Sequence, residues 1–340
     1  MSKSSKHINP SYKKALPKSY SLHECLAQLD TNVQVLSYLI SKSESPLALD
    51  KQLIDDVLSN AQIKKQSKRI AITGSPGVGK STFLNAYGTF LKEQGERIAI
   101  LPVDPTSHIS HGSILGDKTR MSDLVGQESV FIKPMASALA LGGVAPATGA
   151  AISLCEAAGY SYIFIETVGV GQSEYAVKDL VDLFILLIQP GGGDELQGIK
   201  RGIMELADIL IVTKADGSLA TAAKESLEAH KAALRLLISR IDGWAPKCFM
   251  HSYENPDYLK ELHKGVERFF THMETNGLLE SLRRNQAVNL FKSGYKNIFA
   301  QKMMGDIEIK ATIEQLQNNI NNGTLTGYQA LRRLEKNIDE

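Results

Sequence analysis

The chain has 340 residues, of which 43% are hydrophobic and 22% are charged, and its formal net charge is +1. This length suits one large α/β domain with helical additions, or two domains. The near-neutral charge gives no indication that a nucleic acid or an anionic membrane is the main partner. The three cysteines, Cys25, Cys155 and Cys248, lie far apart without metal-ligand spacing, which is typical of reduced thiols in a cytoplasmic protein.

Residues 1–20 are polar and basic, lack the apolar core of a signal peptide, and are expected to be poorly ordered. From Leu22 to about Ser59, apolar residues recur at helical spacing, with a break at Ser45-Pro46. This pattern predicts a helical arm over residues 21–66. The Ala- and Gly-rich segment 136–159 lacks the large aliphatic residues of a membrane span, and none is expected elsewhere.

The apolar run 69–73 leads directly into the sequence GSPGVGKST, which has the G-x-x-x-x-G-K-[ST] pattern of a phosphate-binding loop. In such a loop the backbone N–H groups surround the phosphates of a nucleotide, Lys80 reaches the β- and γ-oxygens, and the Ser81 hydroxyl is a Mg²⁺ ligand. The sequence therefore predicts a nucleoside triphosphate site. The expected loop residues are Gly74, Ser75, Pro76, Gly77, Val78, Gly79, Lys80, Ser81 and Thr82.

Short β-branched runs then alternate with helical stretches, as in a doubly wound α/β sheet. The runs are apolar throughout, which is typical of parallel strands covered on both faces, and they predict an α/β P-loop domain over residues 67–273. Ligands of such a sheet bind beyond the carboxyl ends of its strands. The expected strands are Arg69–Thr73, Ile98–Val103, Tyr162–Glu166, Leu183–Ile188, Ile209–Thr213 and Lys247–Ser252.

Two carboxylates follow strands at the sheet edge that carries the phosphate loop. Asp104 ends the run 98–103, and Glu166 ends the run 162–166. A Mg²⁺ ion bound to phosphates takes a few carboxylate contacts, so these acids suit it. Gly169 resembles the glycine of the D-x-x-G switch of GTPases, whose backbone amide senses the γ-phosphate.

The choice of base follows from Thr213-Lys214-Ala215-Asp216, which resembles the N-K-x-D element of GTPases. The Asp216 carboxylate can accept hydrogen bonds from guanine N1–H and N2–H₂, whereas adenine lacks matching donors, so GTP is favoured over ATP. Thr213 stands where Asn is usual. A second base loop, Ser252, Tyr253 and Glu254, follows the last strand, and Tyr253 replaces the usual small residue.

From about Leu278 the pattern is helical to the end, and residues 274–340 are expected to form a C-terminal helical extension. This segment is too short to build its own core and carries apolar faces. It is expected to pack against the main domain or a second copy of the chain.

Several longer stretches resemble one family: GSILGDKTRM (112–121), LCEAAGY (154–160), ETVGVGQSE (166–174) and GGGDELQGIKRGIMELAD (191–208). With the phosphate loop, they make the chain similar to the MeaB/ArgK/MMAA family. The resemblance implies a SIMIBI-like GTPase that chaperones an adenosylcobalamin-dependent methylmalonyl-CoA-type mutase. It also implies a homodimer whose contact involves the C-terminal helices.

The resemblance further implies a magnesium neighbourhood of Ser81, Asp104, Asp117 and Glu166, and an additional switch loop at 189–200. Val170 follows Gly169 where many GTPases place a water-orienting Gln, so hydrolysis is expected to be slow without a partner. The candidate catalytic residues are Lys80, Glu166, Gln172 and Lys200.

Two other functions stay open at this point. One is an ATPase or kinase serving arginine and ornithine uptake, which predicts ATP use, in conflict with Asp216. The other is a nickel-insertion GTPase, which needs a His-rich tract or paired metal ligands that the eight scattered histidines do not supply.

Overall fold

The computed structural model describes residues 19–62, 66–104, 121–136, 144–167, 173–191, 201–237, 239–322, 324–325, 329 and 333–334. A few side chains within these ranges, including that of Asp104, lie outside the description.

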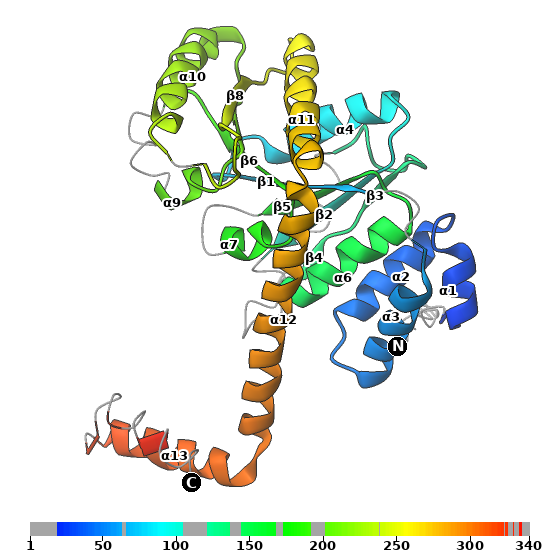
Figure 1. Ribbon diagram of the computed structural model, residues 1–340, viewed down its shortest axis with the longest axis vertical. Coiled ribbons are helices and arrows are strands. Elements are labelled where there is room, and N and C mark those ends of the chain that lie inside the picture. The colour runs from blue at the N-terminus through cyan, green and yellow to red at the C-terminus, as the bar shows by residue number, and fades with distance from the viewer. Residues whose placement is uncertain are drawn as a thin grey trace, which may run out of the picture.

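The core of the molecule is an eight-stranded sheet in the order β3-β2-β5-β1-β6-β7-β8, with β4 also paired to β2 (Figure 1). Every pair in it is parallel. The predicted strands are all present, and β3 and β4, which extend the sheet beside β2, were not predicted. The strands are β1 (Lys68–Gly74), β2 (Ile98–Asp104), β3 (Val130–Ile132), β4 (Met135–Ala136), β5 (Tyr162–Thr167), β6 (Leu183–Ile188), β7 (Ile209–Val212) and β8 (Lys247–Met250).

Successive residues of each strand enter two different cores, because side chains alternate across a sheet. Ile70 and Ile72 of β1 join the core beneath one face, whereas Ala71 joins the core beneath the other. Both faces are therefore buried, which explains why the strand sequences are apolar without alternation. The prediction of a doubly wound α/β sheet is confirmed.

Helices cover both faces (Figure 1). The helices α4 (Lys80–Glu93) and α11 (Asp257–Thr275) contribute to the core on one face. The core on the other face includes residues of α6 (Val144–Ala157), α7 (Ser173–Lys178) and α10 (Ala220–Leu234). Two short segments, α9 (Arg201–Met204) and the 3₁₀ turn η1 (Gly217–Leu219), precede β7 and α10.

Among the described residues, three helices precede the sheet: α1 (Leu22–Gln28), α2 (Val33–Ser43) and α3 (Ala48–Asn60). The predicted break at Ser45-Pro46 separates α2 from α3. A further break separates α1 from α2, and Asn32 caps the N-terminus of α2 there. Arg97 at the start of β2 fixes these helices to the domain, since its guanidinium donates to the carbonyls of Ala158 (2.8 Å) and Asp30 (3.0 Å).

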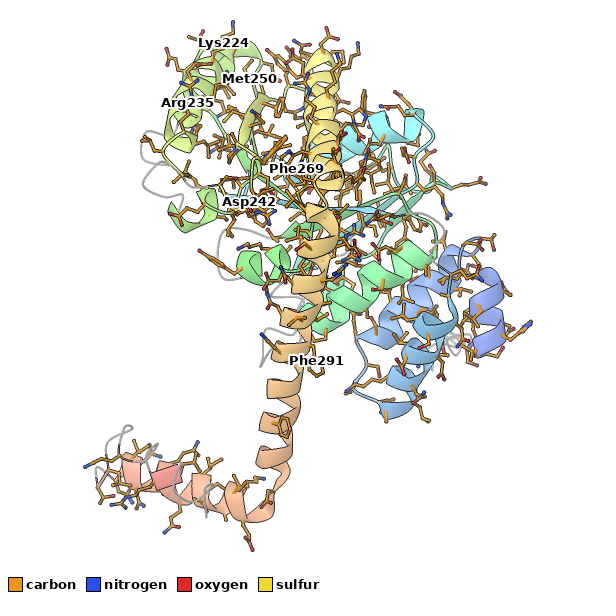
Figure 2. The ribbon with its side chains drawn as sticks, viewed as in Figure 1. Lys224, Arg235, Asp242, Met250, Phe269 and Phe291 are labelled. Atoms are coloured by element: carbon orange, nitrogen blue, oxygen red, sulfur yellow. The ribbon has the colours of Figure 1, made fainter. Side chains whose placement is uncertain are left out.

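The C-terminal part consists of α12 (Leu278–Gly305) and α13 (Ile307–Asn321). The first turns of α12 are tied to the domain, because Arg283 forms an ion pair with buried Asp182 (2.6 Å) and Gln286 donates to the Val181 carbonyl (2.7 Å). Leu290 still packs against the core. Beyond it α12 leaves the α/β body, and α13 turns sharply away from the end of α12 (Figure 1). Phe291, on the departing stretch, is 70% exposed (Figure 2). Within the described ranges, no helix combines the length and apolarity that crossing a membrane requires.

Candidate nucleotide site

The phosphate loop lies between β1 and α4, as the sequence predicted. Gly74 has φ +154°, and a Cβ there would lie 2.6 Å from the Leu187 carbonyl oxygen of β6, so only glycine fits this close approach. Gly79 precedes α4 with φ +99°, a left-handed conformation that allows the helix to start at Lys80. The N-terminus of α4, a helix of 14 residues, thus follows the loop, and its N–H groups and dipole favour an anion there.

Lys80 lies over this loop rather than in solvent. Its Nζ atom donates to the carbonyls of Gly74 (2.8 Å) and Ser75 (3.2 Å), and the residue is only 9% exposed. The ammonium group is therefore held beside the backbone that would surround phosphates. Pro76, Gly77, Val78 and Thr82 complete the same loop and the first turn of α4.

Ser81 and Glu166 meet at the carboxyl edge of the sheet. The Ser81 hydroxyl donates to Glu166 Oε1 (3.1 Å), and both residues are buried. Strand pairing sets Pro102 of β2 beside Glu166, so the backbone of Asp104 ends β2 at the same edge. The structure therefore brings together two of the predicted magnesium ligands. The side chain of Asp104, and all of Asp117, Gln172 and Lys200, lie outside the described residues.

A hydroxyl pair that the sequence did not single out joins the two central strands at this edge. The Thr167 hydroxyl at the end of β5 donates to Thr73 Oγ1 of β1 (2.8 Å), and both side chains are fully buried. The bond fixes the ends of the strands that carry Glu166 and the phosphate loop. The detectable signal was a threonine near the end of each of two apolar runs.

Thr213 connects the base element to the phosphate loop. Its hydroxyl lies 2.8 Å from the Val78 carbonyl oxygen and 3.1 Å from that of Ile188, and its N–H donates to Ile188 (2.8 Å). The side chain is buried. The residue that replaces the usual Asn therefore acts as a brace between the two halves of the site, a role that the sequence did not indicate.

The next three residues complete the predicted base element. Lys214 adopts φ +52°, an uncommon left-handed conformation for a residue with a side chain, and its Nζ donates to Gln189 Oε1 (3.0 Å). The Ser252 hydroxyl donates to Asp216 Oδ2 (2.7 Å) and in turn accepts the N–H of Glu254 (3.0 Å). The Asp216 carboxylate is thus oriented by the second base loop.

Tyr253, the next residue of the predicted second base loop, is 71% exposed. His251, just before it, is buried and packs edge-on against Phe83 of α4, with 5.2 Å between ring centroids. Burial lowers the pKa of His251 to about 4, against a smaller opposing effect of the Asp216 charge. The imidazole is therefore neutral at physiological pH, and its buried Nδ1 atom has no hydrogen-bond partner among the described residues.

The segments that follow the two predicted switch loops lie against each other. A Cβ at Gly202 of α9 would be 2.6 Å from the hydroxyl oxygen of Tyr175 in α7. The helix α7 follows the loop with Gly169, and α9 follows the loop of residues 189–200. The tyrosine side chain thus covers the position of Gly202, and a larger residue there would displace the Tyr175 hydroxyl.

Comparison with known proteins shows the family. The sequence profile described as "Methylmalonyl Co-A mutase-associated GTPase MeaB" matches residues 35–308. The mouse protein named methylmalonic aciduria type A homolog, mitochondrial, is 42% identical over 269 residues, which make up 77% of this chain and 63% of the mouse protein. The chain therefore spans under two thirds of that relative.

The GTPase ArgK of Escherichia coli is 36% identical over 91% of this chain and 92% of its own length. A crystal structure of a protein named LAO/AO transport system kinase superposes with a TM-score of 0.75 at 29% identity, covering 96% of this chain and 100% of that one. The parallel α/β fold agrees with these matches. The chain belongs to the MeaB family of P-loop GTPases.

Proposed function

We propose that this GTPase is a chaperone of an adenosylcobalamin-dependent methylmalonyl-CoA-type mutase, and that it gates delivery of the cofactor and protects the mutase from inactivation. The family description names an association with methylmalonyl-CoA mutase. The observation that carries the proposal is a buried contact between the predicted base element and the phosphate loop in a chain of that family: the Thr213 hydroxyl lies 2.8 Å from the Val78 carbonyl oxygen.

The chemistry that we assign to the site follows from the side-chain atoms that could bind a cation and a nucleotide. Ser81 and Glu166 form a buried, oxygen-only pair, which fits a hard cation such as Mg²⁺, and Asp104 and Asp117 are the further ligands that we propose. A bound Mg²⁺ would supply charge neutralisation at the phosphates. Lys80 would stabilise negative charge on the same oxygens, and the Asp216 carboxylate, held by Ser252, would accept the guanine N–H donors.

The contact between α7 and α9 supports the proposal that a bound partner controls GTP hydrolysis. The Tyr175 hydroxyl lies over Gly202, and we propose this contact as a route that couples the two predicted switch loops. We assign to a bound mutase the role of ordering these loops. Gln172 and Lys200 are the catalytic candidates that they carry.

The C-terminal helices support a homodimer in this proposal. Large apolar side chains of α12 stay exposed where it departs from the domain, namely Val288, Phe291 and Phe299. A second copy would cover such a surface. The free cysteines Cys25, Cys155 and Cys248 are in keeping with the cytoplasmic location that the proposal assumes.

A nucleotide competition assay tests the GTP assignment. Labelled GTP bound to the wild type should be displaced by GTP and GDP but not by ATP, and Asp216→Asn should lose GTP affinity while gaining affinity for xanthosine triphosphate. Asp55→Asn makes the same change at an exposed position of α3; it is the control and should leave both affinities unchanged. Equal displacement by ATP would instead favour an ATPase or kinase linked to arginine and ornithine transport. The similar solved structure carries a name of that kind, LAO/AO transport system kinase.

A further inference from the structure

The edge of the sheet at β8 forms a groove that the nucleotide site does not use. β8 is the last strand of the sheet order, and α10 and α11 flank it on its two faces. Between them lies a cavity of about 540 Å³. It is lined by Lys231, Leu234, Arg235, Trp244, Ala245, Pro246, Lys247, Cys248, Phe249, Gly265 and Arg268.

The backbone of β8 offers hydrogen-bonding groups to this groove. Lys247 donates its N–H to Asp208 (3.1 Å), and His251 donates its N–H to Val212 (2.8 Å), so the odd-numbered residues of this stretch face β7. Because backbone groups alternate sides along a parallel strand, the N–H and C=O groups of Cys248 and Met250 point away from the sheet. This spacing matches the pairing pattern of an added extended strand.

The charge of the groove is one-sided. Four cations from three elements line it, and no carboxylate is among the lining residues: Lys231 and Arg235 come from α10 and the residue after it, Lys247 from β8 and Arg268 from α11. One of them, Lys231, also pairs with exposed Glu228 (2.7 Å), an ion pair that water screens. Since the whole chain carries only +1, this concentration of positive charge is local.

The inner wall of the groove is rigid and aromatic. Trp244 is fixed by a hydrogen bond from Nε1 to the Asp208 carbonyl (3.2 Å) and by edge-on packing against Phe269 (5.1 Å between centroids). Phe249 lies directly on Gly265 of α11, where a Cβ would come within 2.3 Å of the ring. A preformed wall of this kind lowers the entropy cost of binding a ligand.

From these observations we infer that β8 accepts an extended, acidic peptide segment of a partner protein, which pairs with Cys248 and Met250 and places its carboxylates among the four cations. Lysine on an edge strand can also serve only to prevent aggregation. That role needs charge on the strand itself, and it does not account for cations on both flanking helices or for the groove between them. The inference is independent of the proposed mutase partner.

Fluorescence anisotropy with defined peptides tests this inference on the full chain. The probe is a short fluorescein-labelled peptide in which glutamate alternates with valine, and the comparison peptide has the same sequence with N-methylated peptide bonds, which cannot pair with a strand. The first should bind with an affinity that falls as salt is added, and the second should not bind.

Two variants of the same region sharpen the test (Figure 2). Arg235→Glu should weaken peptide binding at least about tenfold, equivalent to about 1.4 kcal/mol. Lys224→Glu makes the same charge change near the start of α10, outside the groove lining, and should leave binding unchanged. Both variants should keep wild-type GTP affinity, which shows that they fold.

Three results would overturn the inference. Equal binding of the N-methylated peptide would show ionic attraction without strand pairing. Tighter binding of single-stranded DNA than of the peptide would identify a nucleic-acid surface. Absence of binding by the glutamate peptide, together with self-association of Lys247→Val, would show that the cations only protect the edge.

Discussion

Replacing Thr213 by valine should loosen the nucleotide site, because it removes one hydroxyl and nearly preserves shape. The Ile188 carbonyl would keep the Thr213 N–H at 2.8 Å, so the principal loss is the 2.8 Å bond to the Val78 carbonyl. Leaving a buried polar group without its partner costs about 1–3 kcal/mol. Since one carbonyl is affected, we expect the free energy of unfolding to fall by about 1–2 kcal/mol.

The same substitution should weaken GTP binding about tenfold, the equivalent of about 1.4 kcal/mol. Base and phosphates must be held at a fixed separation, and in Thr213→Val part of the binding free energy would be used to restore the spacing of the two loops. Urea unfolding measures the first effect, and titration calorimetry with GDP and a non-hydrolysable GTP analogue measures the second.

Thr213→Ser is the matched control, because it keeps the hydroxyl and should retain most of the stability and affinity. The brace would be refuted if Thr213→Val were as stable as the wild type and bound nucleotide equally well. A loss of equal size in Thr213→Ser would assign the effect to the methyl group, also against the reasoning.

Two further changes test the support of the base loop and the C-terminal helices. Between pH 6.5 and about 4 the unfolded chain takes up a proton on His251 that the folded chain refuses, so the free energy of unfolding should fall by about 3 kcal/mol as pH drops through this window. Urea unfolding should show a shallower pH slope in His251→Leu, and an unchanged slope would exclude this histidine as a source. In sedimentation at micromolar concentration, the full chain should be a dimer. A chain ending after Leu290, which keeps the Arg283 and Gln286 anchors, should be a monomer, and a monomeric full chain would contradict the proposed contact.

The fold was largely predictable because its signals are local. The phosphate loop requires glycine where Leu187 comes close, and the strands on both sides are apolar at every position because both faces of the sheet are buried. The strands β3 and β4 were missed because each has at most three residues and Lys133-Pro134 lies between them. Such short segments become strands only by pairing with β2, an interaction between residues distant in the sequence.

One contact of the candidate site, between Ser81 and Glu166, was expected from the sequence, whereas its other contacts were not. Ser81 follows from the phosphate-loop motif and Glu166 from its position at a strand end, and both positions lie at one sheet edge. The brace from Thr213 to Val78 joins residues 135 positions apart, and no sequence pattern reveals that a threonine hydroxyl replaces an amide there. The low pKa of His251 likewise depends on burial against Phe83, which only the packed structure shows.

Steady-state phosphate release from GTP, with and without a purified adenosylcobalamin-dependent methylmalonyl-CoA-type mutase from the same cells, tests the central claim most directly. The account predicts at least about tenfold faster turnover with the mutase, because a bound mutase would position Gln172 and Lys200 to stabilise the transition state. Lys80→Ala provides the inactive control, and Lys200→Ala should reduce the acceleration more than the basal rate. No acceleration, together with no complex in any nucleotide state, would contradict the account.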